Sequence, residues 1–225
     1  MRQRNTEVRR RINMSNKKYV LTETVKELNG VKLFQIKAIT DFGGVAKGDL
    51  GGWIENDKNL DWFGDAWVYG NAWVCGNARV CGDALVYGNA RVYGNARVYG
   101  NAWVSGNARV YGDAWVSDNA RVYGNAWVYG NARVYGNARV YGDARVYNDA
   151  RIKSAKHVVW FTPVGSENGT LTAYATASGE VEVTRGCFRG NLSEFESAVT
   201  ETHSNSRFGV EYLALIKYIK LRFSE

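Results

Sequence analysis

The side chains that most often carry catalysis, histidine and cysteine, are scarce in this sequence. Its 225 residues include two histidines, His157 and His203, and three cysteines, Cys75, Cys81 and Cys187. A histidine can act as a general base near neutral pH, and a cysteine becomes a nucleophile when a neighbouring base lowers its pKa. Two histidines cannot supply the three imidazoles of a catalytic zinc site built from histidine alone. We therefore expect no metal and no cofactor, and His157 is the candidate catalytic base.

Two of the cysteines lie in a stretch that repeats every six residues and contains no histidine. From residue 64 to residue 153, fifteen units follow the pattern Gly-Asn/Asp-Ala-x-Val-x, with Asp118 and Asn148 in place of the glycine and Ile152 in place of the valine. Ala-x-Val-x alternates like a β-strand, so Ala and Val share one face. The Gly-Asn or Gly-Asp pair tolerates the positive φ of a sharp corner. Each unit therefore predicts a short strand followed by a bend.

Two architectures compete for such a repeat. Hairpins that reverse after every four residues would make strands too short to bury a core. A coil that turns at each corner closes a triangular rung with three units, and successive rungs pair as parallel strands about 4.8 Å apart. The fifteen units then make five rungs. Ile54, Leu60 and Trp62 keep roughly the phase of the repeat, which predicts a degenerate rung before the array begins at residue 64. We expect an all-β solenoid of about five to six rungs with Ala and Val inside.

The array resembles the hexapeptide-repeat family of left-handed β-helices, in which an aliphatic residue recurs every six positions and a small residue precedes it by two. The two columns begin with Val68, Val74 and Val80 and with Ala66, Ala72 and Ala78. This resemblance covers the array alone and implies a left-handed parallel β-helix, subunits packed as trimers, and acyl transfer by a histidine base near a cleft between subunits. The flanks KGDLGGWIE (47–55) and RGCFRGNLSEFE (185–196) resemble uncharacterised bacterial and phage or prophage proteins that carry such arrays.

The rest of the chain is expected to cover the two open ends of the solenoid, where unpaired backbone groups would otherwise invite polymerisation. We divide the sequence into a basic, disordered tail (1–18), an N-terminal β cap and lead-in (19–63), the β-helix (64–153) and a C-terminal α+β domain (154–225). The expected strands cover 18–23, 32–39, 157–164, 170–176 and 180–188. The expected helices begin at Ser193 and at Phe208. Cys187 is expected to be a buried thiol in the last of these strands.

The charge distribution supports this division. The net charge is +7, and residues 1–18 contribute most of it with seven Lys or Arg residues against Glu7. Such a tail could contact nucleic acid or an acidic partner, and Met14 would open a shorter protein without most of it. We expect no membrane span and no secretory signal. Because Cys75 and Cys81 fall on different faces, we expect no disulfide framework and a reducing cytoplasmic location.

Outward positions of the array form aromatic and basic columns, one pair on each side of the prism. The residues after Ala are Trp67, Leu85, Trp103, Arg121 and Arg139 on the first side, Trp73, Arg91, Arg109, Trp127 and Arg145 on the second side, and Arg79, Arg97, Trp115, Arg133 and Arg151 on the third side. Tyrosine follows Val in ten of the fifteen units. Stacking between rungs accounts for part of this pattern. The expected exposure of so many rings predicts an interaction surface.

We expect that surface to comprise Arg91, Arg97, Arg109, Trp115, Trp127, Arg133, Arg139 and Arg145. At Arg91 with Arg109 and at Arg133 with Arg151, for example, like charges should lie about 5 Å apart on adjacent rungs. Self-association as a trimer or dimer is the favoured use of the surface. A foreign ligand, such as a host protein or a single-stranded nucleic acid stacking on the rings, is the alternative, and nucleic acid is the less favoured of the two.

Corner aspartates interchange with asparagine along the array, which suits hydrogen bonding to backbone at bends. Asp65 and Asp83 lie one rung apart on the same corner, so a surface hydrogen bond is expected there and a shared cation is the alternative. Taken together, the residues favour a non-catalytic binding or scaffold protein. The resemblance of the flanks implies a phage or prophage protein that acts on a host factor through the aromatic and arginine-lined surface or through its C-terminal domain. The alternative is an acyltransferase-like enzyme with His157 at a subunit seam, and the third hypothesis is anion or nucleic-acid binding along the ladders.

Overall fold

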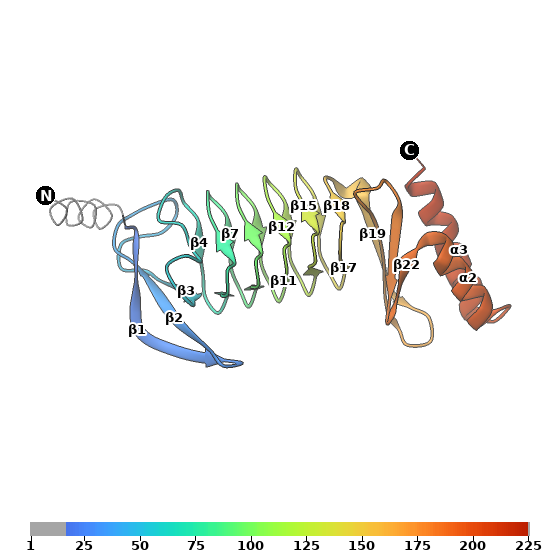
Figure 1. Ribbon diagram of the computed structural model, residues 1–225, viewed down its shortest axis with the longest axis horizontal. Helices are drawn as coiled ribbons and strands as arrows, with labels where there is room; N and C mark the ends of the chain where they lie inside the picture. Colours follow the sequence, from blue (N-terminus) through green and yellow to red (C-terminus); the bar gives the residue numbers. More distant parts are fainter. Residues whose placement is uncertain (1–16, 225) are drawn as a thin grey trace, which may run out of the picture.

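The computed structural model describes residues 17–224, which form a rod with a β-solenoid between two caps (Figure 1). A twisted hairpin lies at the N-terminal end of the rod, and a small sheet with two helices lies at the C-terminal end. Within residues 17–224, no helix has both the length and the apolar character that a membrane span needs. The described part of the chain is therefore a long, regular body with two different ends.

The solenoid consists of fifteen two-residue strands arranged as three parallel sheets. The first side contains β4 (Trp67–Val68), β7 (Leu85–Val86), β10 (Trp103–Val104), β13 (Arg121–Val122) and β16 (Arg139–Val140). The second side contains β5 (Trp73–Val74), β8 (Arg91–Val92), β11 (Arg109–Val110), β14 (Trp127–Val128) and β17 (Arg145–Val146). The third side contains β6 (Arg79–Val80), β9 (Arg97–Val98), β12 (Trp115–Val116), β15 (Arg133–Val134) and β18 (Arg151–Ile152). Each strand pairs with the strand one rung away in direct register, as Val104 does with Val122, so the predicted columns are confirmed.

The interior of the prism is filled by alanine and valine. Every Ala and Val of the repeat, together with Ile152, is 0% exposed. Burying one valine side chain stabilises the fold by roughly 1.5–3 kcal/mol relative to leaving it in water. The columns of small and medium side chains explain why three short sides can close around a narrow core without voids.

The corners require glycine for two reasons. Gly94 has φ +71°, and a Cβ at this residue would lie 3.0 Å from the backbone nitrogen of Gly112 in the next rung. Only the two exceptions in the repeat, Asp118 with φ 58° and Asn148 with φ 46°, place a larger residue at that corner position. Asp and Asn are the residues that best tolerate this left-handed conformation.

A degenerate rung precedes the regular array, as the sequence predicts. Strand β3 (Leu50–Ile54) pairs in parallel with β5, placing Ile54 against Val74, and Leu60 forms a bridge to Val80. Ile54 is 0% exposed and Leu60 is 1% exposed, so both extend the inner columns. Trp62 does not continue them and is half-buried outside the prism. The solenoid therefore has about six turns.

The N-terminal cap extends the second sheet and covers the first rung. Strands β1 (Tyr19–Leu28) and β2 (Val31–Ala38) are antiparallel, and β2 pairs in turn with β3. Lys18 is 5% exposed, and its Nζ donates hydrogen bonds to the carbonyls of Gly64 and Ala66, both at 2.8 Å. Lys17 pairs with Asp57 at 3.2 Å. The two last residues of the expected tail thus belong to the folded cap, while residues 1–16, with the Met14 start, lie outside the described residues.

The C-terminal cap is the expected α+β unit with shifted boundaries. After the short turn η1 (Ala155–His157), β19 (Val158–Val164), β20 (Gly169–Ala175), β21 (Val181–Arg185) and β22 (Phe188–Asn191) form an antiparallel sheet. Helices α2 (Leu192–His203) and α3 (Arg207–Arg222) pack against this sheet around a second apolar core. The single strand expected over 180–188 is a hairpin with its turn at Gly186-Cys187. Helix α2 begins at Leu192, one residue before the expected Ser193, and its N-terminus is capped by Asn191 together with Glu194.

This cap closes the last rung of the solenoid through backbone and side-chain contacts. The amide of Arg145 donates to the Thr172 hydroxyl at 3.1 Å, and the amide of Ala177 donates to the carbonyl of Asp149 at 2.9 Å. Ala150 forms an isolated antiparallel bridge with Thr176. Both ends of the solenoid are therefore occupied by other parts of the same chain, which suppresses end-to-end polymerisation.

Candidate interaction surface

Outward tyrosines stack along the rod with the spacing of the strands that carry them. On the second side, the Tyr93 and Tyr111 ring centroids lie 4.8 Å apart, and those of Tyr111 and Tyr129 lie 4.6 Å apart. On the first side, Tyr123 and Tyr141 are 4.9 Å apart. Burial, followed by the neighbouring tyrosines, raises the pKa of Tyr111 to about 12. In these two stacks, the ring faces are therefore used by other rings.

Guanidinium groups lie over the tryptophans of neighbouring rungs. Arg91 lies 5.6 Å from the Trp73 ring centroid, and Arg109 lies 4.6 Å from that of Trp127. These two arginines are partners in the ladder, yet each guanidinium has its own ring, so the expected crowding of like charges is relieved. Cation–π contacts of this kind stabilise by about 0.5–1 kcal/mol at exposed sites. These arginines are thus positioned by the tryptophans of neighbouring rungs.

The array does not expose the large apolar patch that its composition predicts. Among its described tyrosines and tryptophans, only Tyr141 is substantially exposed, at 41%. Trp67 is fully buried because Tyr19 and Phe42 from the N-terminal cap cover its ring, with centroids 6.1 and 5.3 Å away. Flat stacking leaves mainly ring edges in contact with water. The expectation of an exposed aromatic surface on the array is therefore wrong.

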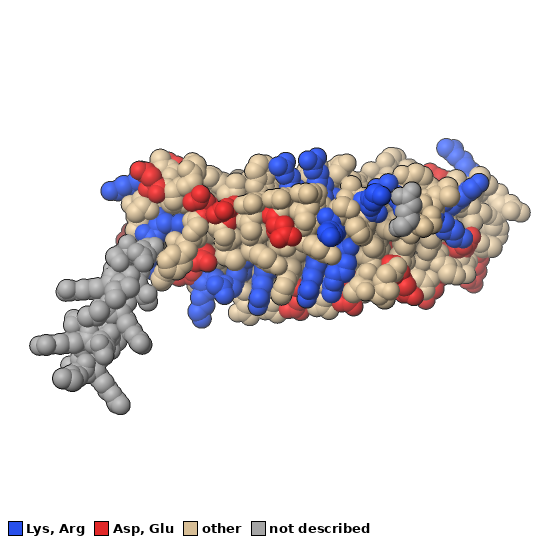
Figure 2. Space-filling view, turned by 90° about the horizontal axis from the view of Figure 1, so that it is seen from above, with Lys and Arg blue, Asp and Glu red and all other residues tan. Residues whose placement is uncertain are grey.

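The eight residues expected to form one interaction surface are distributed over three sides. The second side carries Arg91, Arg109, Trp127 and Arg145, the third side carries Arg97, Trp115 and Arg133, and the first side carries Arg139. Figure 2 shows Lys and Arg side chains standing in rows across the solenoid on one face of the rod. The structure therefore separates the predicted surface into smaller basic and aromatic faces.

Two of these faces are hollowed where serine replaces tyrosine. A hollow of about 380 Å³ on the third side is lined by Tyr99, Trp115, Ser117, Asp118, Arg133, Tyr135 and Arg151. A hollow of about 210 Å³ on the first side is lined by Tyr87, Trp103, Ser105, Arg121, Tyr123 and Arg139. The sequence carries a signal for both, namely a small residue inside a column of tyrosines, which the prediction of a continuous aromatic surface missed.

Larger hollows lie at the two junctions between the solenoid and its caps. The N-terminal one, about 1060 Å³, includes Glu55, Asp57, Trp62 and Arg79. The C-terminal one, about 830 Å³, is lined by Glu180, Glu182, Arg189 and Glu194 among others. Arg189 Nε donates to Glu182 Oε1 at 2.6 Å, and the Glu194 carboxylate accepts the backbone amide of Asn191, so these groups are engaged within the cap.

The two histidines lie outside the array and apart from these hollows. His157 ends the turn after β18, and its Nδ1 is 3.0 Å from the Ser154 hydroxyl. His203 ends α2, where its ring lies 5.4 Å from that of Tyr212. Both imidazoles therefore make local contacts of the kind that structural histidines make. The predicted role of His157 as a base at a subunit seam stays a prediction.

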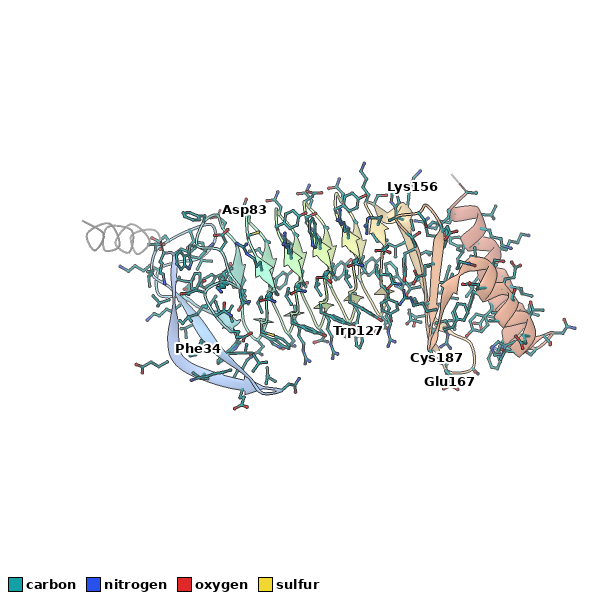
Figure 3. The ribbon with its side chains drawn as sticks, viewed as in Figure 1. Phe34, Asp83, Trp127, Lys156, Glu167 and Cys187 are labelled. Carbon is teal, nitrogen blue, oxygen red and sulfur yellow. The ribbon has the colours of Figure 1, made fainter. Side chains whose placement is uncertain are left out.

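The cysteines are free and lie in three different settings. Cys75 is buried, and burial raises its pKa to about 11. Burial also raises the pKa of Cys81. Because these thiols stay protonated near neutral pH, they are poor nucleophiles. Cys187 is exposed in the turn between β21 and β22 (Figure 3), so the expectation of a buried thiol is wrong. The pairing of β21 with β22 turns residue 187 into a hairpin tip.

Corner side chains form hydrogen-bonded ladders along the rod. Asn77 Nδ2 donates to Asn95 Oδ1 at 3.1 Å, and Asn95 Nδ2 donates to Asp113 Oδ1 at 2.9 Å. A carboxylate only accepts, so aspartate ends such a ladder. Asp83 Oδ1 accepts the backbone amide of Asp65 at 3.0 Å, which confirms the expected surface hydrogen bond. Residues 17–224 contain no group of three or more His, Cys, Asp or Glu side chains arranged to hold a metal ion.

Comparison with known protein families finds a match within the array. Overlapping segments, 78–91, 90–106, 102–118, 116–130, 126–142, 132–148 and 138–153, match the family model described as YdcK Beta solenoid repeat. No curated protein matches the chain. The chain thus contains a YdcK-type β-solenoid repeat domain of about six turns, flanked by an antiparallel N-terminal sheet and a C-terminal sheet with two helices.

Proposed function

We propose that this protein is a non-catalytic binding protein whose solenoid receives an acidic protein partner on its basic, aromatic sides. The observation that carries this proposal is the hollow on the third side, where Arg133 and Arg151 stand beside Trp115. Arg133 lies 4.6 Å from the Trp115 ring centroid. A guanidinium held over a ring keeps donors at its edge for a carboxylate and loses little entropy on binding.

An acidic protein fits this surface better than a nucleic acid. Sequence-tolerant binding of single strands depends on aromatic faces on which bases stack. On the third side the Trp115 ring lies under Arg97 and Arg133, and on the second side Tyr93, Tyr111 and Tyr129 are stacked on one another. What the sides still offer is a set of oriented guanidinium groups. These recognise carboxylates bidentately.

The remaining features of the proposal come from the sequence. The resemblance to left-handed hexapeptide-repeat proteins, and that of the flanks to phage or prophage proteins, favours a cytoplasmic protein that engages a host factor. The acyltransferase alternative needs His157 as a base at a subunit seam. That alternative predicts that an acyl-CoA raises the melting temperature and that His157→Ala abolishes turnover.

We also propose that self-association uses α3 rather than the array. The apolar side chains that protrude from this helix are Val210 at 62%, Leu213 at 40%, Tyr218 at 46% and Leu221 at 66% exposed. In an antiparallel pair of α3 helices, Val210 lies at the height of Leu221 from the second copy, and Leu213 lies at the height of Tyr218. Apolar groups would thus meet apolar groups over three turns, which makes a second copy the fitting partner.

Titration of the protein with an acetylated, amidated hexaglutamate peptide at low salt tests the binding proposal. The variant Arg97→Ala/Arg133→Ala/Arg151→Ala should lose the part of the binding that the third side contributes. The matched variant Arg91→Ala/Arg109→Ala/Arg145→Ala, which removes three arginines from the second side, should retain it. Equal loss in both variants would show a diffuse charge effect, and the absence of binding to the unchanged protein would refute the proposal. A shift of melting temperature with acyl-CoA would instead favour the enzyme.

A further inference from the structure

Ser105 and Ser117 create two notches of the same construction in the outer wall of the solenoid. We propose that each notch binds one carboxylate of an acidic peptide segment, so that one chain carries two equivalent sites. This inference rests on the proposed binding function and assigns it to particular atoms.

The two notches are built from the same residue types, twelve positions apart along the chain. The first-side set is Tyr87, Trp103, Ser105, Arg121, Tyr123 and Arg139, and the third-side set is Tyr99, Trp115, Ser117, Arg133, Tyr135 and Arg151. Their geometry also agrees. The Tyr-to-Trp centroid distance is 6.3 Å at 77° in the first notch and 6.1 Å at 78° in the second.

The arginine that follows the tryptophan by one rung takes the same place in both notches. Arg121 lies 4.3 Å from the Trp103 ring centroid, and Arg133 lies 4.6 Å from that of Trp115. Both arginines are exposed at their outer edge. Each notch therefore has an aromatic wall and an oriented guanidinium at its rim.

The serine hydroxyls form the polar floor of the notches. Ser105 is 8% exposed and Ser117 is 5% exposed, yet both line the hollows. Their backbone groups are bonded, for example Ser105 N to the Val122 carbonyl and Ser117 N to the Val134 carbonyl. Neither hydroxyl has a hydrogen-bond partner among residues 17–224. Neither hydroxyl oxygen is among the fully buried polar atoms that lack a partner, so both are open to the notch and can bond to a ligand there.

A carboxylate suits this combination of donors. It accepts a hydrogen bond from the hydroxyl and charge-assisted bonds from the guanidinium, while the methylene groups of a glutamate pack against the tryptophan. Hollows of about 210 and 380 Å³ lie at or below the lower end of small-molecule sites, so they fit a side chain better than a whole ligand.

The third-side notch differs from the first-side notch in two charged groups, Arg97 and Asp118. Arg97 also lies over Trp115, at 5.2 Å, where the first side has Leu85 in the corresponding place. Asp118 borders the notch, and its Oδ2 accepts the amide of Gly136 at 2.9 Å. The additional guanidinium offsets the aspartate, so the two notches keep the same net preference for an anion.

Crowding by the neighbouring tryptophan does not account for the serines. Trp127 is followed at the same spacing by Tyr129, and this pair fits on the solenoid surface, although Trp73 is followed by the smaller Cys75. Tyrosine at position 105 or 117 would therefore be compatible with the repeat. The serines are departures that open space which the fold itself does not need.

The test restores the repeat by Ser105→Tyr, Ser117→Tyr and both changes together, and measures binding of the hexaglutamate peptide by calorimetric titration and NMR. We expect two sites in the unchanged protein, one in each single variant and none in the double variant, with unfolding temperatures at least as high as the original. Ser117→Ala keeps the cavity and should weaken its site about tenfold through loss of one bond to a charged group.

Several outcomes would overturn the assignment. If the double Ser→Tyr variant binds as the original does while the Arg97/Arg133/Arg151 variant does not, the proposed function stands and the notches are not its sites. Equal binding of a hexaglutamine peptide would show that no carboxylate is recognised. If the unchanged protein binds neither peptide, the proposed function and the notch assignment both fall.

Discussion

At the scale of single residues, Lys18 is a buried cation that caps one end of the solenoid. Its amine lies at the end of the solenoid and donates to carbonyls of the first rung that have no strand before them. Burial lowers its pKa to about 8, although Asp61, Asp65 and Asp83 act in the opposite direction. The ammonium group of Lys18 thus supplies hydrogen bonds to backbone carbonyls at the end of the solenoid, and its burial removes favourable hydration.

The first prediction concerns the effect of pH on this lysine. Between about pH 8 and the ordinary value near 10.5, the unfolded chain holds the Lys18 proton more tightly than the folded chain, so the contribution of Lys18 to stability rises with pH. Lys18→Met should destabilise the protein by about 1–3 kcal/mol because it leaves carbonyls unpaired. The difference from the unchanged protein should grow from about pH 7.5 to about pH 9.5. Urea unfolding at both values measures it, and a constant difference would contradict the lowered pKa.

A second prediction concerns the corners. Gly94→Ala places a Cβ at φ +71° and 3.0 Å from the Gly112 nitrogen, so it should destabilise the protein by at least about 1–2 kcal/mol. Asp118→Gly removes a non-glycine residue from the same kind of corner but also loses the bond to Gly136, so it should change stability much less. Thermal unfolding compares the two. Similar losses for both would mean that corner conformation is not the limiting factor.

At the scale of elements, each side of the prism is a set of very short strands joined by side-chain ladders. A two-residue strand offers few backbone bonds, so stacked rings and corner amides contribute much of the cohesion between rungs. Ser105 and Ser117 interrupt the tyrosine columns in the middle of the first and third sides. The second side, which continues into β1 to β3, keeps an unbroken tyrosine stack from Tyr93 to Tyr129.

The prediction at this scale compares a stacked tyrosine with one outside the stack. Tyr111 packs between Tyr93 and Tyr129, whereas Tyr135 has no ring contact within residues 17–224. Tyr111→Leu should therefore cost about 1–2 kcal/mol more than Tyr135→Leu, the value of two aromatic pairs. Chemical denaturation followed by circular dichroism provides the comparison. Equal effects would indicate that the ladders contribute little beyond burial.

At the scale of the whole molecule, stability should fall at high pH because many tyrosines are shielded. Burial raises the pKa values of Tyr93 and Tyr111, the latter to about 12, while tyrosine in the unfolded chain titrates near 10. Between these values the unfolded state has released protons that the folded state still holds, so the stability decreases as the pH rises. The urea midpoint should be lower at about pH 11.5 than at about pH 10, and less so for Tyr111→Leu. An unchanged midpoint would argue against shielded rings.

The last prediction concerns assembly. Light scattering should give a mass near twice the 25.1 kDa of one chain, and Leu213→Glu/Leu221→Glu should return it to that of a single chain. Trp127→Glu serves as the matched control on the array and should leave the mass unchanged, since its ring lies under arginines and not in an exposed patch. A mass that falls only in the Trp127 variant would place the contact on the solenoid.

The six-residue period by itself determined the solenoid, its three sides and its Ala and Val interior, because small inward side chains and positive-φ corners admit few other structures. It also placed Asp118 and Asn148 at corners and Ile54 and Leu60 in an earlier rung. Only the tertiary structure decided how the outer side chains lie, because rings and guanidinium groups are free to rotate until neighbouring rungs position them. For this reason the sequence predicts an exposed aromatic face where the structure has stacked rings. The notches at Ser105 and Ser117 likewise depend on the positions of the side chains around them.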